Sequence, residues 1–170
     1  GGSFTAFTTG VLNNLKRIKF HSISGTSGGA IQAALFAQSQ KDYSETSYEF
    51  WKSLAAKSFP ALIYFQQLIC DTMMLNIDYS AALQAEIERF VKFDVLNRKR
   101  QKLFIGATNL LTNEAVVWTN RGLDAKKLLS SCVIIPTCKP VEIDGQLYVD
   151  GFWSQNPPIR QFLLDEIPDE

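Results

Sequence analysis

The stretch FHSISGTSGGAIQAALFA, residues 20–37, decides the fold of this chain. Residues 20–24 are predicted to form a short strand, residues 25–29 are rich in glycine, and residues 30–37 have the small apolar character of a buried helix. Ser27 lies in the glycine-rich segment, within a match to the pattern G-x-S-x-G. The order of strand, tight turn and helix therefore predicts a sharp turn that presents Ser27 at the start of a helix.

The residue types around Ser27 suit a nucleophile elbow. The flanking glycines allow strained backbone angles, so the hydroxyl can stand clear of the sheet. The amide of Gly28 can face a developing oxyanion, and Gly25, Thr26 and Gly29 complete the motif. A helix-starting Gly-Ser turn and a phosphate-binding nest remain as alternatives, whereas a nucleotide P-loop is disfavoured because no Lys follows the glycines.

A serine nucleophile needs a base, and the chain has a single histidine, His21. His21 precedes Ser27 by six residues on the same strand, which separates them by up to ~20 Å. A Ser-His-Asp triad from this chain is therefore excluded unless other sequence supplies the histidine. Asp150 is the best candidate proton acceptor. It ends a predicted hairpin that turns at Asp144-Gly145, and Gly151 follows it. The alternative is that Asp150-Gly151 only forms a turn.

The composition indicates one globular domain over residues 1–170. Apolar residues make up 46% of the chain, and 17 Lys and Arg balance 17 Asp and Glu to a net charge of zero. Balanced charge offers no basic field for phosphates, which argues against a nucleic-acid partner. The three cysteines, Cys70, Cys132 and Cys138, form no CxxC pair, so neither a disulfide framework nor a metal site is predicted.

The chain begins Gly-Gly-Ser-Phe, without a Met or a signal-peptide pattern, and we expect it to be truncated at the N-terminus. Its most apolar stretch, residues 59–75, contains Pro60 and Asp71 and falls short of the run of about 18 uncharged residues that a membrane span needs. These features favour a cytoplasmic or peripheral membrane location and leave the compartment open.

Helical and strand periods alternate along the rest of the sequence, which indicates an α/β fold. The basic run Arg98-Lys99-Arg100 is predicted to be a solvated loop. Helices are expected over residues 7–15, 44–57, 59–74, 80–92 and 124–131, and strands over residues 103–108, 114–119, 141–143 and 146–149.

Taken in order, these segments resemble the patatin-like phospholipase family, whose members pair a G-x-S-x-G serine with an aspartate in a D-G-[GA] motif. The resemblance spans nearly the whole chain. Residues 1–3 resemble the glycine-rich oxyanion loop and residues 24–30 the elbow. Residues 107–110 and 114–117 resemble an internal strand pair, and residues 130–136 resemble the small-residue segment before the aspartate. Residues 140–151, followed by residues 156–158, resemble the aspartate region.

The resemblance implies a three-layer α/β/α sandwich with a mixed central sheet whose first strand is missing from this chain. It also implies a serine lipid acyl hydrolase, of phospholipase A or lipid esterase type, that acts on lipid or phospholipid acyl esters and touches membranes peripherally. In that mechanism Ser27 is the nucleophile of an acyl-enzyme, Asp150 accepts its proton, and no metal or organic cofactor is required. The oxyanion hole would consist of the amides of Gly1, Gly2, Ser3 and Gly28.

Three departures from the family pattern are plain. Ser3 stands in place of a third glycine, Thr5 stands where Arg or Lys is common, and Phe152 replaces a small residue after Asp150-Gly151. Phe152 could crowd the Ser-Asp pair or lengthen an acyl-binding wall. The departures keep an alternative open, a catalytically silent patatin-like domain that binds lipid or a protein partner.

Residues 59–75 also carry a prediction. Their apolar side chains fall on more than one helical face, which is typical of a lid or acyl-binding wall over the Ser27 pocket. Phe65 and Leu68 are its expected contacts with substrate, and an ordinary core helix is the alternative.

Overall fold

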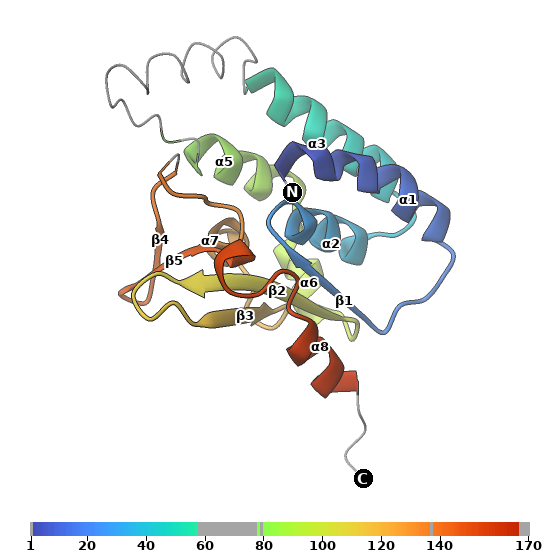
Figure 1. Ribbon diagram of the computed structural model, residues 1–170. Coiled ribbons are helices and arrows are strands. Elements are labelled where there is room, and N and C mark those ends of the chain that lie inside the picture. Colours follow the sequence, from blue (N-terminus) through green and yellow to red (C-terminus); the bar gives the residue numbers. More distant parts are fainter. Residues whose placement is uncertain (1, 58–77, 79, 137, 167–170) are drawn as a thin grey trace.

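A computed structural model describes residues 2–57, 78, 80–136 and 138–166. The fold is α/β, with a mixed five-stranded sheet and helices on its faces (Figure 1). The strands are β1 Ser22–Thr26, β2 Lys102–Asn109, β3 Ala115–Thr119, β4 Val141–Ile143 and β5 Gln146–Asp150. The helical elements are η1 Gly2–Phe7, α1 Thr8–Leu15, α2 Gly28–Gln38, α3 Tyr43–Lys57, α5 Ser80–Phe90, α6 Phe93–Arg98, α7 Ala125–Ser130, η2 Gly151–Trp153 and α8 Ile159–Glu166.

Strand β2 organises the sheet. It pairs in parallel with β1 and antiparallel with β3 and β5, and β5 in turn pairs antiparallel with β4. Because β3 overlaps both β1 and β5 along β2, β1 and β5 must share the opposite edge of β2. β1 occupies that edge up to Gly106, and β5 takes it over from Ala107. The carboxyl ends of β1 and β5 therefore meet at one point along β2.

The main core lies between the sheet and the helices drawn above it in Figure 1. α2 is buried along nearly its whole length because its side chains are small and apolar, and Leu103 and Ile105 of β2 join the same cluster. On the other face, Pro158 approaches Gly106, and α8 contacts β1. The expected three-layer α/β/α arrangement with a mixed sheet is thus confirmed.

Long-range contacts correct several predicted boundaries. The first strand lies two residues later than predicted, because Gly25 and Thr26 pair with β2 and are not part of the turn. The helix expected over residues 80–92 ends at Phe90, since the side chain of Gln38 accepts from the amide of Lys92 (2.8 Å) and donates to the carbonyl of Phe90 (3.0 Å).

The basic run at residues 98–100 was predicted to be a loop, and the prediction is wrong for its first residue. Arg98 is the last residue of helix α6, Phe93–Arg98. The helix expected over residues 59–74, with Phe65 and Leu68, lies outside the described residues. Within the described residues, no helix combines the length and apolar character required to cross a bilayer.

Candidate active site

Ser27 lies on a sharp turn between β1 and α2. Its φ of 59° and ψ of −136° are strained for a residue with a side chain, as a nucleophile elbow requires. Gly25 is required here, because a Cβ on it would lie 2.4 Å from the carbonyl oxygen of Gly29. The absence of a side chain at Gly25 lets the start of α2 approach β1 closely enough to form the turn.

Hydrogen bonds from the segment after α7 hold this strained turn. The amide of Ser27 donates to Oγ of Ser131 (3.0 Å), and that hydroxyl donates to the carbonyl of Gly106 on β2 (2.6 Å). The carbonyl of Ser27 accepts from Sγ of Cys132 (3.3 Å) and from the amide of Ala30 (2.9 Å). The turn is thus fixed from both sides, which is what a strained backbone needs in order to persist.

The meeting of strand ends brings Asp150 to Ser27. Thr26 pairs with Gly106, and Asp150 pairs with Ala107, the next residue of β2. A Cβ on Gly151 would lie 2.6 Å from the carbonyl oxygen of Gly106 and 2.9 Å from Cγ2 of Thr26, so β5 ends against β1 itself. Neighbouring positions on β2 are ~3.3 Å apart, which places the two candidate residues close together at the carboxyl ends of β1 and β5.

The Asp150 carboxyl group is fully buried, and its two oxygens differ. Oδ1 accepts from the amide of Phe152 (2.8 Å), whereas Oδ2 has no hydrogen-bond partner among the described residues. Burial raises the pKa of this carboxyl, and the hydrogen bond from the Phe152 amide and the influence of the nearby Ser27 side chain both oppose that rise. Ser27 thus lies near enough to influence the carboxyl, although its bond to Oδ2 is not formed, a looseness common in catalytic pairs without substrate.

Phe152 follows Asp150-Gly151 with an exposed side chain. Its side chain is 61% exposed and packs edge-on against the ring of Trp153, with the ring centroids 5.5 Å apart. The backbone amide of Phe152, rather than its ring, reaches Asp150. The contact that the structure gives between Phe152 and the buried carboxyl group of Asp150 is thus a backbone hydrogen bond.

The predicted oxyanion donors are described in part. Gly28 opens α2, and its amide has no acceptor among the described residues, so it is available at a helix N-terminus. Gly2 and Ser3 open η1, and Gly1 lies outside the described residues. The sequence therefore predicts more of this hole than the structure describes.

Buried Gln32 ties η1 to the elbow helix. Its side-chain amide donates to the carbonyl of Thr5 (2.8 Å) and to Oγ1 of Thr9 (3.1 Å). Its oxygen accepts from the hydroxyls of Tyr43 (2.5 Å) and Ser47 (2.9 Å). Neither Gln32 nor Ser131 was identified as a site residue from sequence, although a single Gln among the apolar residues of 30–37 is a usable signal for a buried polar anchor.

His21 is exposed and precedes the start of β1, whereas Ser27 follows its end. Its backbone carbonyl accepts from the amide of Lys102 (3.0 Å). As for metal ligands, no group of three or more His, Cys, Asp or Glu residues in the described part of the chain could hold an ion.

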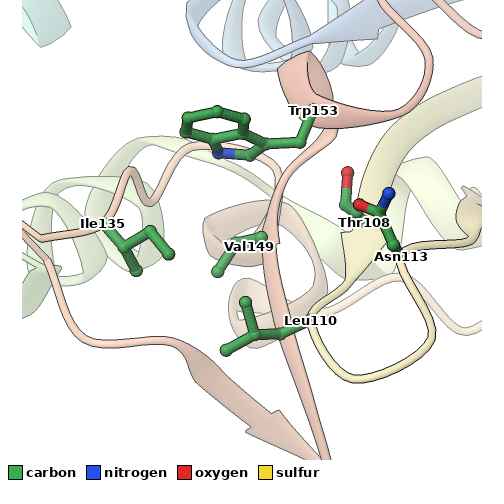
Figure 2. Close-up of a pocket in the computed structure, with 6 residues that line it drawn as sticks. All are labelled: Thr108, Leu110, Asn113, Ile135, Val149 and Trp153. Atoms are coloured by element: carbon green, nitrogen blue, oxygen red, sulfur yellow. The ribbon is translucent and has the colours of Figure 1, made fainter.

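A cavity of about 180 Å³ lies near the end of β5, and Figure 2 shows its six lining residues: Thr108, Leu110, Asn113, Ile135, Val149 and Trp153. Neither Ser27 nor Asp150 lines it. Val149 and Asp150 are successive strand residues, so their side chains point to opposite faces of the sheet. Thr108 links this cavity to the site, because its hydroxyl donates to the carbonyl of Asp150 (2.9 Å).

Comparison with known proteins identifies a family for this chain. The family model described as patatin-like phospholipase matches residues 1–163 of the chain. The comparison with curated proteins gives no match.

Proposed function

Since the chain belongs to the patatin-like phospholipase family, whose members hydrolyse lipid acyl esters, we propose that it is a serine lipid acyl hydrolase with a Ser27-Asp150 dyad. Its substrate is a lipid or phospholipid acyl ester. The observation that carries the proposal is the meeting of the β1 and β5 ends on β2, beside a buried carboxylate oxygen with no partner among the described residues.

The first half of the reaction acylates the enzyme. Asp150 accepts the hydroxyl proton of Ser27 as Oγ attacks the ester carbonyl carbon. The carbonyl oxygen becomes an oxyanion, stabilised by the amide of Gly28 and by those of Gly1, Gly2 and Ser3. When the bond to the leaving alkoxide breaks, Asp150 returns the proton to it. The acyl group remains as an ester on Ser27.

The second half releases the acid. Asp150 takes a proton from a water molecule while the oxygen of that water attacks the acyl carbonyl carbon. The same amides stabilise the second oxyanion. The bond to Ser27 then breaks, the proton returns to Oγ, and a carboxylic acid leaves. The raised pKa of Asp150 suits this role, because a more basic carboxylate accepts a serine proton more readily.

Hydrolysis of a fluorogenic acyl ester tests the proposal. We expect Ser27→Ala and Asp150→Asn each to abolish turnover while the fold is retained, and the double variant to lose no more than either, because the two side chains act as one unit. Ser44→Ala, on the first turn of α3, and Asp144→Asn, in the hairpin turn, are the matched controls and should keep activity.

Turnover by Ser27→Ala at the parent rate would reject the dyad. A parent protein that binds phospholipid vesicles without hydrolysing any ester would instead favour the catalytically silent domain. The rates of hydrolysis of a phospholipid and of a short soluble ester, measured in the same assay, then identify the substrate class.

A further inference from the structure

A second cavity, of about 630 Å³, lies where β2 begins and β3 ends. It is remote from Ser27, because Lys102 at its rim pairs with Ser22 at the start of β1, four residues before Thr26. Four residues of strand span about 13 Å, so this cavity opens at the opposite end of the sheet from the elbow.

The lining of this cavity is strongly basic. Five cationic side chains line it, namely Arg98, Lys99, Arg100, Lys102 and Arg121, and no Asp or Glu is found among its described lining residues. Arg98, Arg100 and Arg121 are exposed, and none of them forms an ion pair within the described part of the chain. In a chain whose net charge is zero, so local a positive field is a specific feature of this surface.

The backbone that carries these arginines is held by two side-chain amides, of buried Asn120 and half-buried Asn97. The side chain of Asn120 accepts from the amide of Leu103 (3.1 Å) and donates to the carbonyls of Leu96 (3.0 Å) and Lys99 (3.3 Å). Asn97 exchanges two hydrogen bonds of 3.0 Å with the backbone of Leu123. The segments that flank the cavity are therefore fixed to one another before any ligand arrives, which lowers the entropy lost on binding.

The cations divide into two kinds. Nζ of Lys99 donates to the carbonyl of Ala37 at the end of α2 (2.6 Å), so that ammonium already has an acceptor. The guanidinium groups of the three arginines form no ion pair within the described residues. Each is a planar fork of N–H donors that matches two oxygens of a phosphate. Their mutual repulsion is relieved when a multiply charged anion enters between them.

We propose that this cavity binds a phosphate-bearing anion with at least two negative charges, through Arg98, Arg100 and Arg121. The anion is either a soluble polyphosphate or the headgroup of an anionic lipid, since both present the same oxygens. A compact headgroup fits a concave site of this volume, whereas an extended nucleic-acid strand needs a basic surface that continues beyond it. The site is independent of the chemistry at Ser27.

Binding measurements on the whole chain test the proposal with two probes. Inositol trisphosphate in calorimetry represents the soluble source, and co-sedimentation with phosphatidylcholine vesicles that carry phosphatidylinositol bisphosphate represents the lipid source. We expect at least one probe to bind, more weakly at high salt, and pure phosphatidylcholine vesicles to bind less. Binding to both probes assigns the phosphate group itself, and binding to vesicles alone assigns the membrane-bound headgroup.

The variant Arg98→Gln/Arg100→Gln/Arg121→Gln should weaken this binding by at least about tenfold, because three charge-assisted contacts are lost. The control Lys16→Gln/Arg17→Gln/Arg160→Gln removes the same charge from exposed positions outside the cavity and should change it by less than about twofold. Arg121→Gln alone gives a readout if the triple variant does not fold, and Ser27→Ala should bind as the parent does. No binding of either probe, equal losses in both triple variants, or tighter binding of a single-stranded oligonucleotide than of both probes would overturn the proposal.

Discussion

Gly25→Ala is expected to destabilise the protein, although the change adds a single methyl group. The new Cβ would lie 2.4 Å from the carbonyl oxygen of Gly29, 2.6 Å from its carbon and 2.8 Å from the amide nitrogen of Ala30. All three are backbone atoms at the start of α2, so β1 and α2 would have to move apart. Overpacking of a fixed interior costs about 1 to 3 kcal/mol, and rigid backbone on the receiving side puts this case at about 2 to 3 kcal/mol.

Gly29→Ala is the matched control within the same motif. A Cβ at this position meets nothing within 4 Å, and Gly29 lies inside α2, where Ala is preferred over Gly by about 0.5 to 1 kcal/mol. In thermal unfolding followed by circular dichroism, we expect Gly25→Ala to lower Tm by about 4 to 12 °C and Gly29→Ala to raise it by about 1 to 4 °C. Equal shifts in the two variants, or a Gly25→Ala protein as stable as the parent, would refute the strand-helix contact.

Four further outcomes are expected. Burial raises the pKa of Asp150 above its value in the unfolded chain, so the charged carboxylate destabilises the fold at pH values above the raised pKa. Asp150→Asn should therefore raise Tm at neutral pH, and this gain in Tm should shrink as pH falls into the ordinary range of Asp pKa values. A gain in Tm that does not depend on pH would contradict this origin. Turnover by the parent protein should also fall as pH drops into this range, since a protonated Asp150 cannot accept a proton. Ser131→Ala leaves the amide of Ser27 and the carbonyl of Gly106 without their hydroxyl partner. It should lower the free energy of unfolding in urea by about 1 to 3 kcal/mol and lower kcat more than it raises KM. An unchanged kcat would reject the positioning role of Ser131. His21→Ala should keep full activity in the ester assay, and a loss of orders of magnitude would restore histidine as the base.

The features that sequence predicted well depend on local geometry. Asp144-Gly145 fixes the turn of the hairpin by itself, and the structure has positive φ at both residues, 51° and 75°. Likewise, the elbow pattern depends on residues within one turn of Ser27, and the strain found there was expected from the pattern alone. Such features need no knowledge of the rest of the chain.

The features that sequence missed depend on contacts between distant residues. Ser131 reaches Ser27 across 104 positions, and Gln32 reaches Thr5 across 27. Helix α5 ends at Phe90, where the side chain of Gln38 bonds to the carbonyl of Phe90 and the amide of Lys92 in place of further helical hydrogen bonds. The sequence around Phe90 carries no helix stop signal. Each of these partners is a polar side chain buried by tertiary packing, so no local pattern identifies it.

Covalent labelling tests the central claim most directly. A fluorophosphonate carries the tetrahedral geometry of the acyl-transfer intermediate and reacts only with an activated serine. After incubation of the parent protein, peptide mass spectrometry should locate one adduct on Ser27, with strongly reduced labelling in Asp150→Asn and none in Ser27→Ala. An adduct on another serine, or a folded parent protein that remains unlabelled, would contradict the assignment of Ser27 as the nucleophile.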